Sequence, residues 1–188
     1  APTVSGSVSL LPRGDEHLAL LGADAEMVRR RVADLASPLN FAVGEDPPAD
    51  LPAVWATAAR AVTHDLDCRQ HGRLVSSTKV GWCFLVSDGE WIAVGFEAND
   101  DADVGGYQRC QSYRLETSAA QALVWLADDV QEQLNGQEFV QWPIAGQHVL
   151  APRIIDGQAV WVEPSTNAVT APIGELFAAP ITPDREWI

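Results

Sequence analysis

Residues 77–97, read as STKVGWCFLVSDGEWIAVGFE, constrain the fold more than any other part of the chain. Two apolar runs flank Asp88-Gly89, and both residues of such a pair tolerate the positive φ that a tight type I′ turn requires. The flanking Val, Ile, Phe and Trp residues suit a pleated surface. The stretch therefore predicts a β-hairpin. Its first strand is apolar on both faces, so we expect a helix on one face and another element or chain on the other.

Other strands are predicted on both sides of this hairpin. Residues 153–162 contain a second Asp-Gly pair, Asp156-Gly157, between two β-prone runs and predict a second hairpin. A returning strand is expected at residues 107–115 and one more at 166–173. Weaker strand patterns occupy residues 4–11, 17–21 and 41–43.

Three segments show helical periodicity. Residues 24–37 begin with acidic residues, carry apolar side chains at helical spacing and are followed by Pro38. A second helix is predicted from Pro52 to Gly72. The third has Thr117 or Ser118 as N-cap and stops at Asn135-Gly136. Its apolar stripe consists of Leu123, Leu126, Val130 and Leu134.

Together these elements predict an α+β fold: an antiparallel sheet of about five or six strands, two or three packed helices and a C-terminal β-hairpin. A chain of 188 residues suits one domain of ordinary size. We expect residues 1–140 to form the α+β core domain. Residues 141–188, which are richer in proline and turn residues, are expected to form a hairpin extension and a tail packed on that core.

The formal net charge of -14 disfavours nucleic acid as a partner, because an acidic surface repels phosphate backbones. No apolar run approaches the ~18 residues that a membrane span needs, so we expect no membrane insertion. Three cysteines without a dense spacing pattern favour a reducing cytoplasm. A single lysine among twelve basic residues, with abundant alanine, is typical of proteins from GC-rich bacterial genomes.

His64, Cys68 and His71 form the sharpest candidate metal site. A helix that continues this far places them at i, i+4 and i+7, on one face. Imidazole and thiolate are zinc ligands, but zinc prefers four of them, so a further cysteine or a carboxylate would have to come from the sheet. The alternative interpretation is a polar helix end with a buried cysteine and two solvated histidines. We therefore expect no cofactor, with zinc as the alternative.

Seven tryptophans are many for a chain of this length. Most of them suit core or half-buried positions, but Trp82, Trp91 and Trp161 would form a partner-binding platform if they shared an outward face. An acidic loop after the first hairpin would extend this surface, and its spacing departs from the EF-hand pattern of calcium sites. The acidic residues of the predicted surface are Asp100, Asp101 and Asp103.

Residues 119–176 include SAAQALVWLADDVQEQL, QWPIAGQHVLAPRIIDGQAVWVEP and API-GEL. This part resembles the C-terminal half of uncharacterised actinobacterial proteins. In those proteins the Trp-Pro segment and the end of the A-V-W-V strand carry Cys and His residues that resemble a small zinc ribbon. Here Trp142 and Pro143 match, His148 corresponds to one histidine, and Glu163 stands where a cysteine is expected. The resemblance implies a bacterial origin and a ribbon-like hairpin, without the cysteines of a structural zinc site and without a known activity.

The function predicted from these features is a cytoplasmic binding module. Its acidic, Trp-containing surface would recognise a protein partner, which could be basic, in bacterial defence, toxin immunity or regulation. One alternative is a metal-assisted hydrolase that uses His64, Cys68 and His71. Another is a homodimeric accessory protein without catalysis.

Overall fold

The computed structural model describes residues 36–42, 45–72, 75–99, 102, 104–108 and 112–177. From Ser37 onward these residues belong to one compact unit, Ser37–Ile188. The strands expected at residues 4–11 and 17–21 and most of the helix expected at 24–37 lie outside the described residues. The prediction of helix is wrong at Ala36 and Ser37, which begin a strand. Pro38 gives the physical reason, because it disfavours helical backbone in the residue before it.

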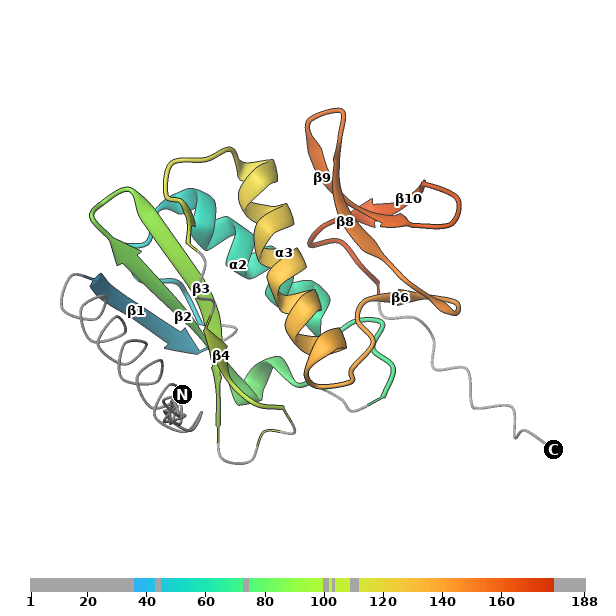
Figure 1. Ribbon diagram of the computed structural model, residues 1–188, viewed down its shortest axis with the longest axis horizontal. Coiled ribbons are helices and arrows are strands. Elements are labelled where there is room, and N and C mark those ends of the chain that lie inside the picture. Colours follow the sequence, from blue (N-terminus) through green and yellow to red (C-terminus); the bar gives the residue numbers. More distant parts are fainter. Residues whose placement is uncertain are drawn as a thin grey trace, which may run out of the picture. The chain divides into compact units, whose positions relative to one another are not determined.

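Five strands form the main sheet of the described chain (Figure 1). They run in the order β1-β2-β3-β4, and β5 also pairs with β3. β1 is an edge strand, where a proline without an N–H group is tolerated. The expected strand at residues 107–115 is interrupted and appears as two short strands. The bounds are β1 Ala36–Ala42, β2 Val80–Ser87, β3 Trp91–Ala98, β4 Tyr107–Gln108 and β5 Tyr113–Arg114.

The first predicted hairpin is confirmed by the antiparallel pairing of β2 with β3. Asp88 and Gly89 adopt φ values of 53° and 66°, and the Glu90 N–H donates to the Ser87 carbonyl at 3.2 Å. Both central residues of this turn therefore have the left-handed backbone of a type I′ turn. A short 3₁₀ helix, η1 (Ser77–Lys79), leads into the hairpin.

Helix α3 spans Ala119–Gly136, and these bounds agree closely with the helix predicted from the sequence. The Ser118 side chain accepts a hydrogen bond from the Gln121 N–H at 3.2 Å, as an N-cap residue does. Gly136 is the last helical residue instead of the residue that stops the helix. Leu126, Val130 and Leu134 are fully buried, and Leu123 is partly buried and packs against the same core, so the predicted apolar stripe faces the core.

Helix α2 spans Ala53–Leu66, so the prediction that it continues to Gly72 is wrong. Arg69 has a left-handed φ of 53°, which a continuing helix does not allow. In addition, the Asp67 carboxylate accepts hydrogen bonds from the Ser77 N–H at 3.0 Å and the Ser77 hydroxyl at 2.6 Å. These contacts between Asp67 and Ser77 fix the residues after Leu66 in a non-helical path.

The C-terminal part adds a three-stranded sheet in the order β10-β9-β8 and a small two-stranded sheet. The second predicted hairpin is confirmed, since Ile155 pairs with Gln158 across Asp156 and Gly157, both of which have positive φ. The bounds are β6 Ile144–Ala145, β7 His148–Val149, β8 Ala151–Ile155, β9 Gln158–Glu163 and β10 Ala168–Pro172.

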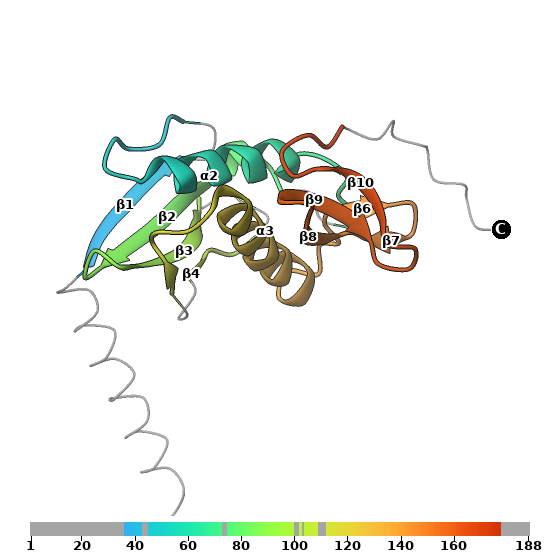
Figure 2. The ribbon, with the colours of Figure 1, turned by 90° about the horizontal axis from the view of Figure 1, so that it is seen from above.

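Helix α3 contacts both β3 and the β8-β9 hairpin, and it lies between the main sheet and the three-stranded sheet in both views (Figures 1 and 2). Helix α2 packs along α3. One cluster of buried side chains joins the helices to both sheets, including Trp55, Phe84, Leu126 and Trp161. The described chain is therefore an α+β fold with antiparallel sheets, as predicted. The division into domains at residue 140 stays a prediction.

Candidate functional site

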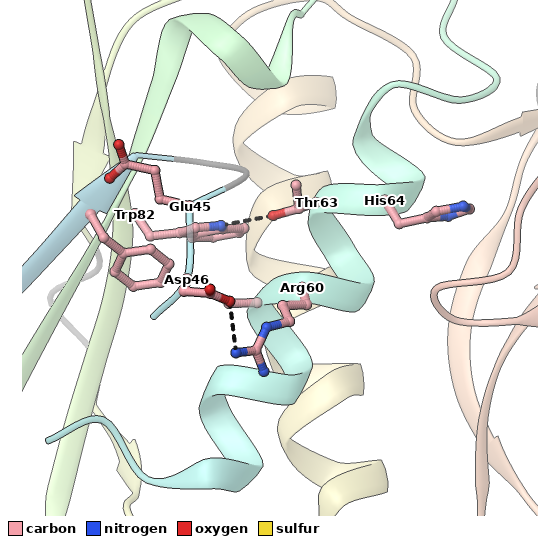
Figure 3. A pocket seen from close by; sticks show the side chains of 8 residues that line it. Glu45, Asp46, Arg60, Thr63, His64 and Trp82 are labelled. Atoms are coloured by element: carbon pink, nitrogen blue, oxygen red, sulfur yellow. Dashed lines mark hydrogen bonds and ion pairs between the residues drawn. The ribbon is translucent and has the colours of Figure 1, made fainter. Parts of the chain in front are cut away.

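A groove of about 250 Å³ lies between the start of the main sheet and helix α2 (Figure 3). β1 and β2 form one wall, the segment that follows β1 forms the rim, and one face of α2 forms the other wall. We call this the α2 groove. Its lining residues are Phe41, Glu45, Asp46, Ala59, Arg60, Thr63, His64 and Trp82.

The floor of the α2 groove is apolar. The Trp82 ring is only 2% exposed, and its Nε1–H donates to the Thr63 hydroxyl at 2.9 Å, so its one polar group is paired. Phe41 stacks on Phe84 with ring centroids 5.9 Å apart, which holds the Phe41 ring against the sheet. Ala59 is buried on the helix side. Of these side chains only Phe41 is partly exposed, so Phe41 is the one that can contact an apolar group, and the floor contains no unpaired donor.

The rim of the α2 groove carries accessible charges. Arg60 contacts Asp46 at 3.4 Å, with 56% and 98% of the two side chains exposed. Glu45 is also exposed, and its carboxylate lies 3.4 Å from the Ala42 N–H at the end of β1. A solvent-exposed ion pair of this kind contributes only about 0–1 kcal/mol. Another cation can therefore displace Arg60 from Asp46 at low cost.

Asp65 lies next to the groove residue His64 but is fully buried. Its Oδ2 accepts from the Trp161 indole N–H at 2.7 Å and from the Gly174 N–H at 2.6 Å. Its Oδ1 accepts from the Leu176 N–H at 2.9 Å and lies 3.1 Å from His64 Nδ1. We call this set of contacts the Asp65 clasp. It holds the segment after β10 and strand β9 against the end of α2.

The three residues of the predicted metal site do not form a ligand set in the structure. The His64 imidazole points away from the α2 groove (Figure 3). Cys68 lies beyond the end of α2 and donates its S–H to the carbonyls of His64 at 3.5 Å and Leu176 at 3.4 Å. His71 forms an isolated backbone bridge with Gln141. The expected helical stripe does not exist because α2 ends at Leu66. Within the described residues, no group of three or more His, Cys, Asp or Glu side chains could hold a metal ion.

The three tryptophans of the predicted binding platform do not share one surface. Trp82 and Trp161 are buried, with 2% and 0% exposure. Trp91 is 36% exposed, and the Arg114 guanidinium lies 4.4 Å from its ring centroid. The acidic residues expected beside them, Asp100, Asp101 and Asp103, lie outside the described residues.

Both cysteines that the structure describes are poor nucleophiles. Burial raises the pKa of the Cys68 thiol, and the negative charges of Asp65 and Asp67 raise it further. Burial also raises the pKa of Cys83, as its place between two aromatic residues of an apolar strand predicts, and Glu97 adds to the effect. Protonated thiols do not attack carbonyl groups or bind metals effectively at neutral pH.

In the C-terminal part, His148 Nε2 lies 3.9 Å from the Glu163 carboxylate. Hydrogen bonds from Thr166 and Ser165 lower the pKa of Glu163, and the nearby His148 lowers it further. The two residues singled out by the resemblance thus lie together, and Glu163 accepts the side-chain hydrogen bonds of the turn between β9 and β10.

The sequence analysis missed the α2 groove and the Asp65 clasp. The groove leaves little signal in the sequence, because its residues come from three separated segments. Asp65 does leave one: it lies between Val62 and Leu66 on the apolar face of a helical pattern, where a carboxylate requires buried partners.

Comparison with protein-family models, with curated proteins and with solved structures finds no match for this chain. Neither helix of the described part is long and apolar enough to cross a bilayer.

Proposed function

We propose that this protein is a binding module that recognises a basic protein partner through the α2 groove. The observation that carries the proposal is an apolar floor bordered by two accessible carboxylates, those of Glu45 and Asp46. The proposal keeps the acidic, tryptophan-containing surface expected from the sequence. It assigns that role to the groove over Trp82.

A lysine or arginine side chain matches this arrangement chemically. Its aliphatic stem can lie on the partly exposed Phe41 ring while its charged head reaches the carboxylates at the rim. The competing cation, Arg60, is held by one exposed contact of 3.4 Å to Asp46. A net charge of -14 would also steer a basic partner toward the molecule over long range.

The dimensions of the groove favour one inserted side chain over a small-molecule substrate. Its volume of about 250 Å³ is below the range of about 300–1,000 Å³ that is typical of ligand pockets. Its polar groups are two carboxylates, one guanidinium, the Thr63 hydroxyl already bonded to Trp82, and a histidine whose ring faces away. This set lacks a nucleophile paired with a base, so it favours recognition over catalysis.

A salt-dependent pull-down tests the proposal. The tagged full chain is incubated with lysate of its native source and washed at about 50 mM and about 500 mM NaCl, a range over which charge screening becomes strong. We expect a basic protein that is recovered at low salt and largely lost at high salt. The double variant Glu45→Gln, Asp46→Asn should recover at least about tenfold less, which corresponds to about 1.4 kcal/mol.

The matched control is the double variant Asp128→Asn, Asp156→Asn. It removes the same charge from exposed positions on α3 and on the second hairpin. It should change recovery less than about twofold, because distant surface charges are screened. Recovery that does not respond to salt, or that falls equally in both double variants, would contradict the proposed role of the groove.

Elemental analysis separates this proposal from the metal-assisted hydrolase. Purified protein with about one zinc per chain, lost on Cys68→Ser, would favour the hydrolase. The homodimeric accessory protein is tested by light scattering, where it requires twice the mass of one chain.

A further inference from the structure

Strand β1 forms one edge of the main sheet and also contributes to the α2 groove. The strand order is β1-β2-β3-β4, so β1 pairs with β2 on one side, and no strand of the described chain is hydrogen-bonded to its other side (Figure 1). The backbone N–H and C=O groups along such an edge can pair with another chain. The same strand carries Phe41, the partly exposed ring of the groove. The edge and the groove are therefore next to each other.

The backbone groups of β1 alternate between the two sides of the strand. The Phe41 carbonyl oxygen lies toward β2, since it is 3.3 Å from the place that a Cβ on Gly81 would take. The next residue faces Glu45 instead: the Ala42 N–H lies 3.4 Å from the Glu45 carboxylate, and its carbonyl accepts from the Glu45 N–H at 3.0 Å. Residues i and i+2 of a strand turn these groups to the same side, so the N–H and C=O of Asn40 face outward.

An added strand would place a side chain beside the groove. Leu39 and Phe41 pack against the core. Asn40 and Ala42, which alternate with them, are exposed. A residue directly opposite Phe41 on an added strand would have its Cβ about 4.5–5.5 Å from the Phe41 Cβ, on the same face of the sheet. Its side chain would start at the partly exposed ring and extend toward the carboxylates at the rim.

The charges of the groove complement one basic side chain. Its lining contains two carboxylates, Glu45 and Asp46, and one guanidinium, that of Arg60, so these three groups carry a formal charge of -1. Arg60 contacts Asp46, and the Glu45 carboxylate is exposed. One lysine or arginine from outside would therefore neutralise the lining.

We propose that an extended segment of the basic partner adds to the outer edge of β1 as a further strand of the main sheet, and that a lysine or arginine opposite Phe41 enters the α2 groove. Backbone bonds to Asn40 would supply affinity and register, and the groove would select the side chain, which is how strand-addition complexes combine the two. This inference rests on the proposed function, because it specifies how the partner of the same site is held.

The first experiment measures the affinity of the full chain for a synthetic peptide by fluorescence anisotropy at low salt. The probe is the fluorescently labelled peptide TVTRTVT, capped at both ends, which is β-prone and has arginine at its centre. We expect a Kd below about 1 mM that weakens at least about tenfold in the double variant Glu45→Gln, Asp46→Asn. The control Asp128→Asn, Asp156→Asn should change it less than about twofold. A wild-type chain that does not bind the peptide at about 1 mM would overturn the inference.

Backbone methylation distinguishes strand addition from capture of the arginine alone. Alternate N–H groups of an extended peptide face opposite sides, so only one alternate set can bond to β1. Two peptides with the same side chains are compared, one N-methylated at both threonines next to arginine and the other at both valines. We expect one of them to bind at least about tenfold more weakly than the parent peptide and the other to stay within about twofold. Equal affinities of the two methylated peptides would overturn the inference.

The complementary change is made on β1. Asn40→Pro removes the outward N–H, and an edge strand tolerates proline where the N–H faces away from the sheet. Asn40→Thr keeps this N–H and is the matched control. We expect binding at least about fivefold weaker in the proline variant and within about twofold of wild type in the threonine variant. Urea midpoints check that both variants are folded, and the methylated peptides decide the question if the proline variant is not.

The outcomes keep this inference separate from the proposed function. Binding that depends on Glu45 and Asp46 but is equal in the two Asn40 variants and the two methylated peptides overturns the strand addition and leaves the proposed function standing. Binding that depends on the Asn40 N–H but not on the two carboxylates supports the strand addition and contradicts recognition of a basic partner.

Discussion

Replacing Asp65 with asparagine should destabilise the fold more than any other change of one carboxylate to an amide among the residues named above. The buried carboxylate receives three N–H donors at 2.6–2.9 Å, and all three come from residues at least ninety-six positions away in the sequence. An asparagine has one oxygen and one NH₂ group in the same place. Whichever way the amide is oriented, at least one of the three donors faces another donor.

The magnitude follows from these contacts. If the NH₂ group of the introduced amide lies on the side of Leu176 and His64, the Leu176 N–H is left without an acceptor, which costs about 1–3 kcal/mol. The bonds from Trp161 and Gly174 then lose their ionic acceptor, and hydrogen bonds to charged groups are roughly twice as strong as neutral ones. Together these losses amount to about 2–4 kcal/mol, a large share of the about 5–15 kcal/mol that holds a typical domain folded.

Urea denaturation followed by circular dichroism measures this loss, provided that the m value is unchanged. Hydrogen exchange of the Gly174 and Leu176 amides should also become faster, because the segment after β10 loses its anchor. Asp128→Asn, on an exposed position of α3, is the control and should stay within about 0.5 kcal/mol of wild type. An Asp65→Asn protein destabilised by less than about 1 kcal/mol would refute the role assigned to the Asp65 clasp.

Three further predictions follow from local geometry. Gly174→Ala should lower the urea midpoint of unfolding more than Gly146→Ala does. Both glycines have positive φ, but only a Cβ added at position 174 would clash with Ala61, at 2.7 Å. Equal midpoints for the two variants would contradict this prediction. In a Cys110→Ser background, a thiol reagent at neutral pH should modify neither Cys68 nor Cys83 until the protein unfolds, because burial raises the pKa of both thiols. Rapid labelling of the native protein would contradict this prediction. Glu163→Gln should cost stability at neutral pH, where the carboxylate is ionised. Because hydrogen bonding from Thr166 and Ser165 lowers the pKa of Glu163, that cost should disappear as the pH falls through the lowered pKa, and a cost independent of pH would exclude the mechanism.

The elements that could be predicted are those whose sequence signals, such as turn residues and helix caps, lie within a few residues of one another. The two Asp-Gly turns require left-handed backbone at adjacent positions, and both hairpins form where this requirement predicts them. Ser118 and the apolar stripe on α3 act within one helix, so its start and its buried face were also predictable.

The end of α2 could not be predicted in the same way. The residues after Leu66 contain no strong helix breaker before Gly72, and the chain turns because Asp67 binds Ser77, ten positions away. With that turn, the predicted alignment of His64, Cys68 and His71 disappears. The candidate metal site therefore depended on one helix boundary that tertiary contacts decide.

The amino-acid sequence alone determined the α+β class, the two hairpins, the capped helix α3 and the strongly acidic surface, because turn chemistry, side-chain periodicity and charge act locally or add up over the chain. Only the tertiary structure decided which tryptophans are buried, where Asp65 finds its partners, and that Phe41, Asp46, Arg60 and Trp82 line one groove. These properties depend on contacts between segments far apart in the sequence, and the free energy of such contacts is set by packing and hydrogen-bond geometry that no short pattern contains.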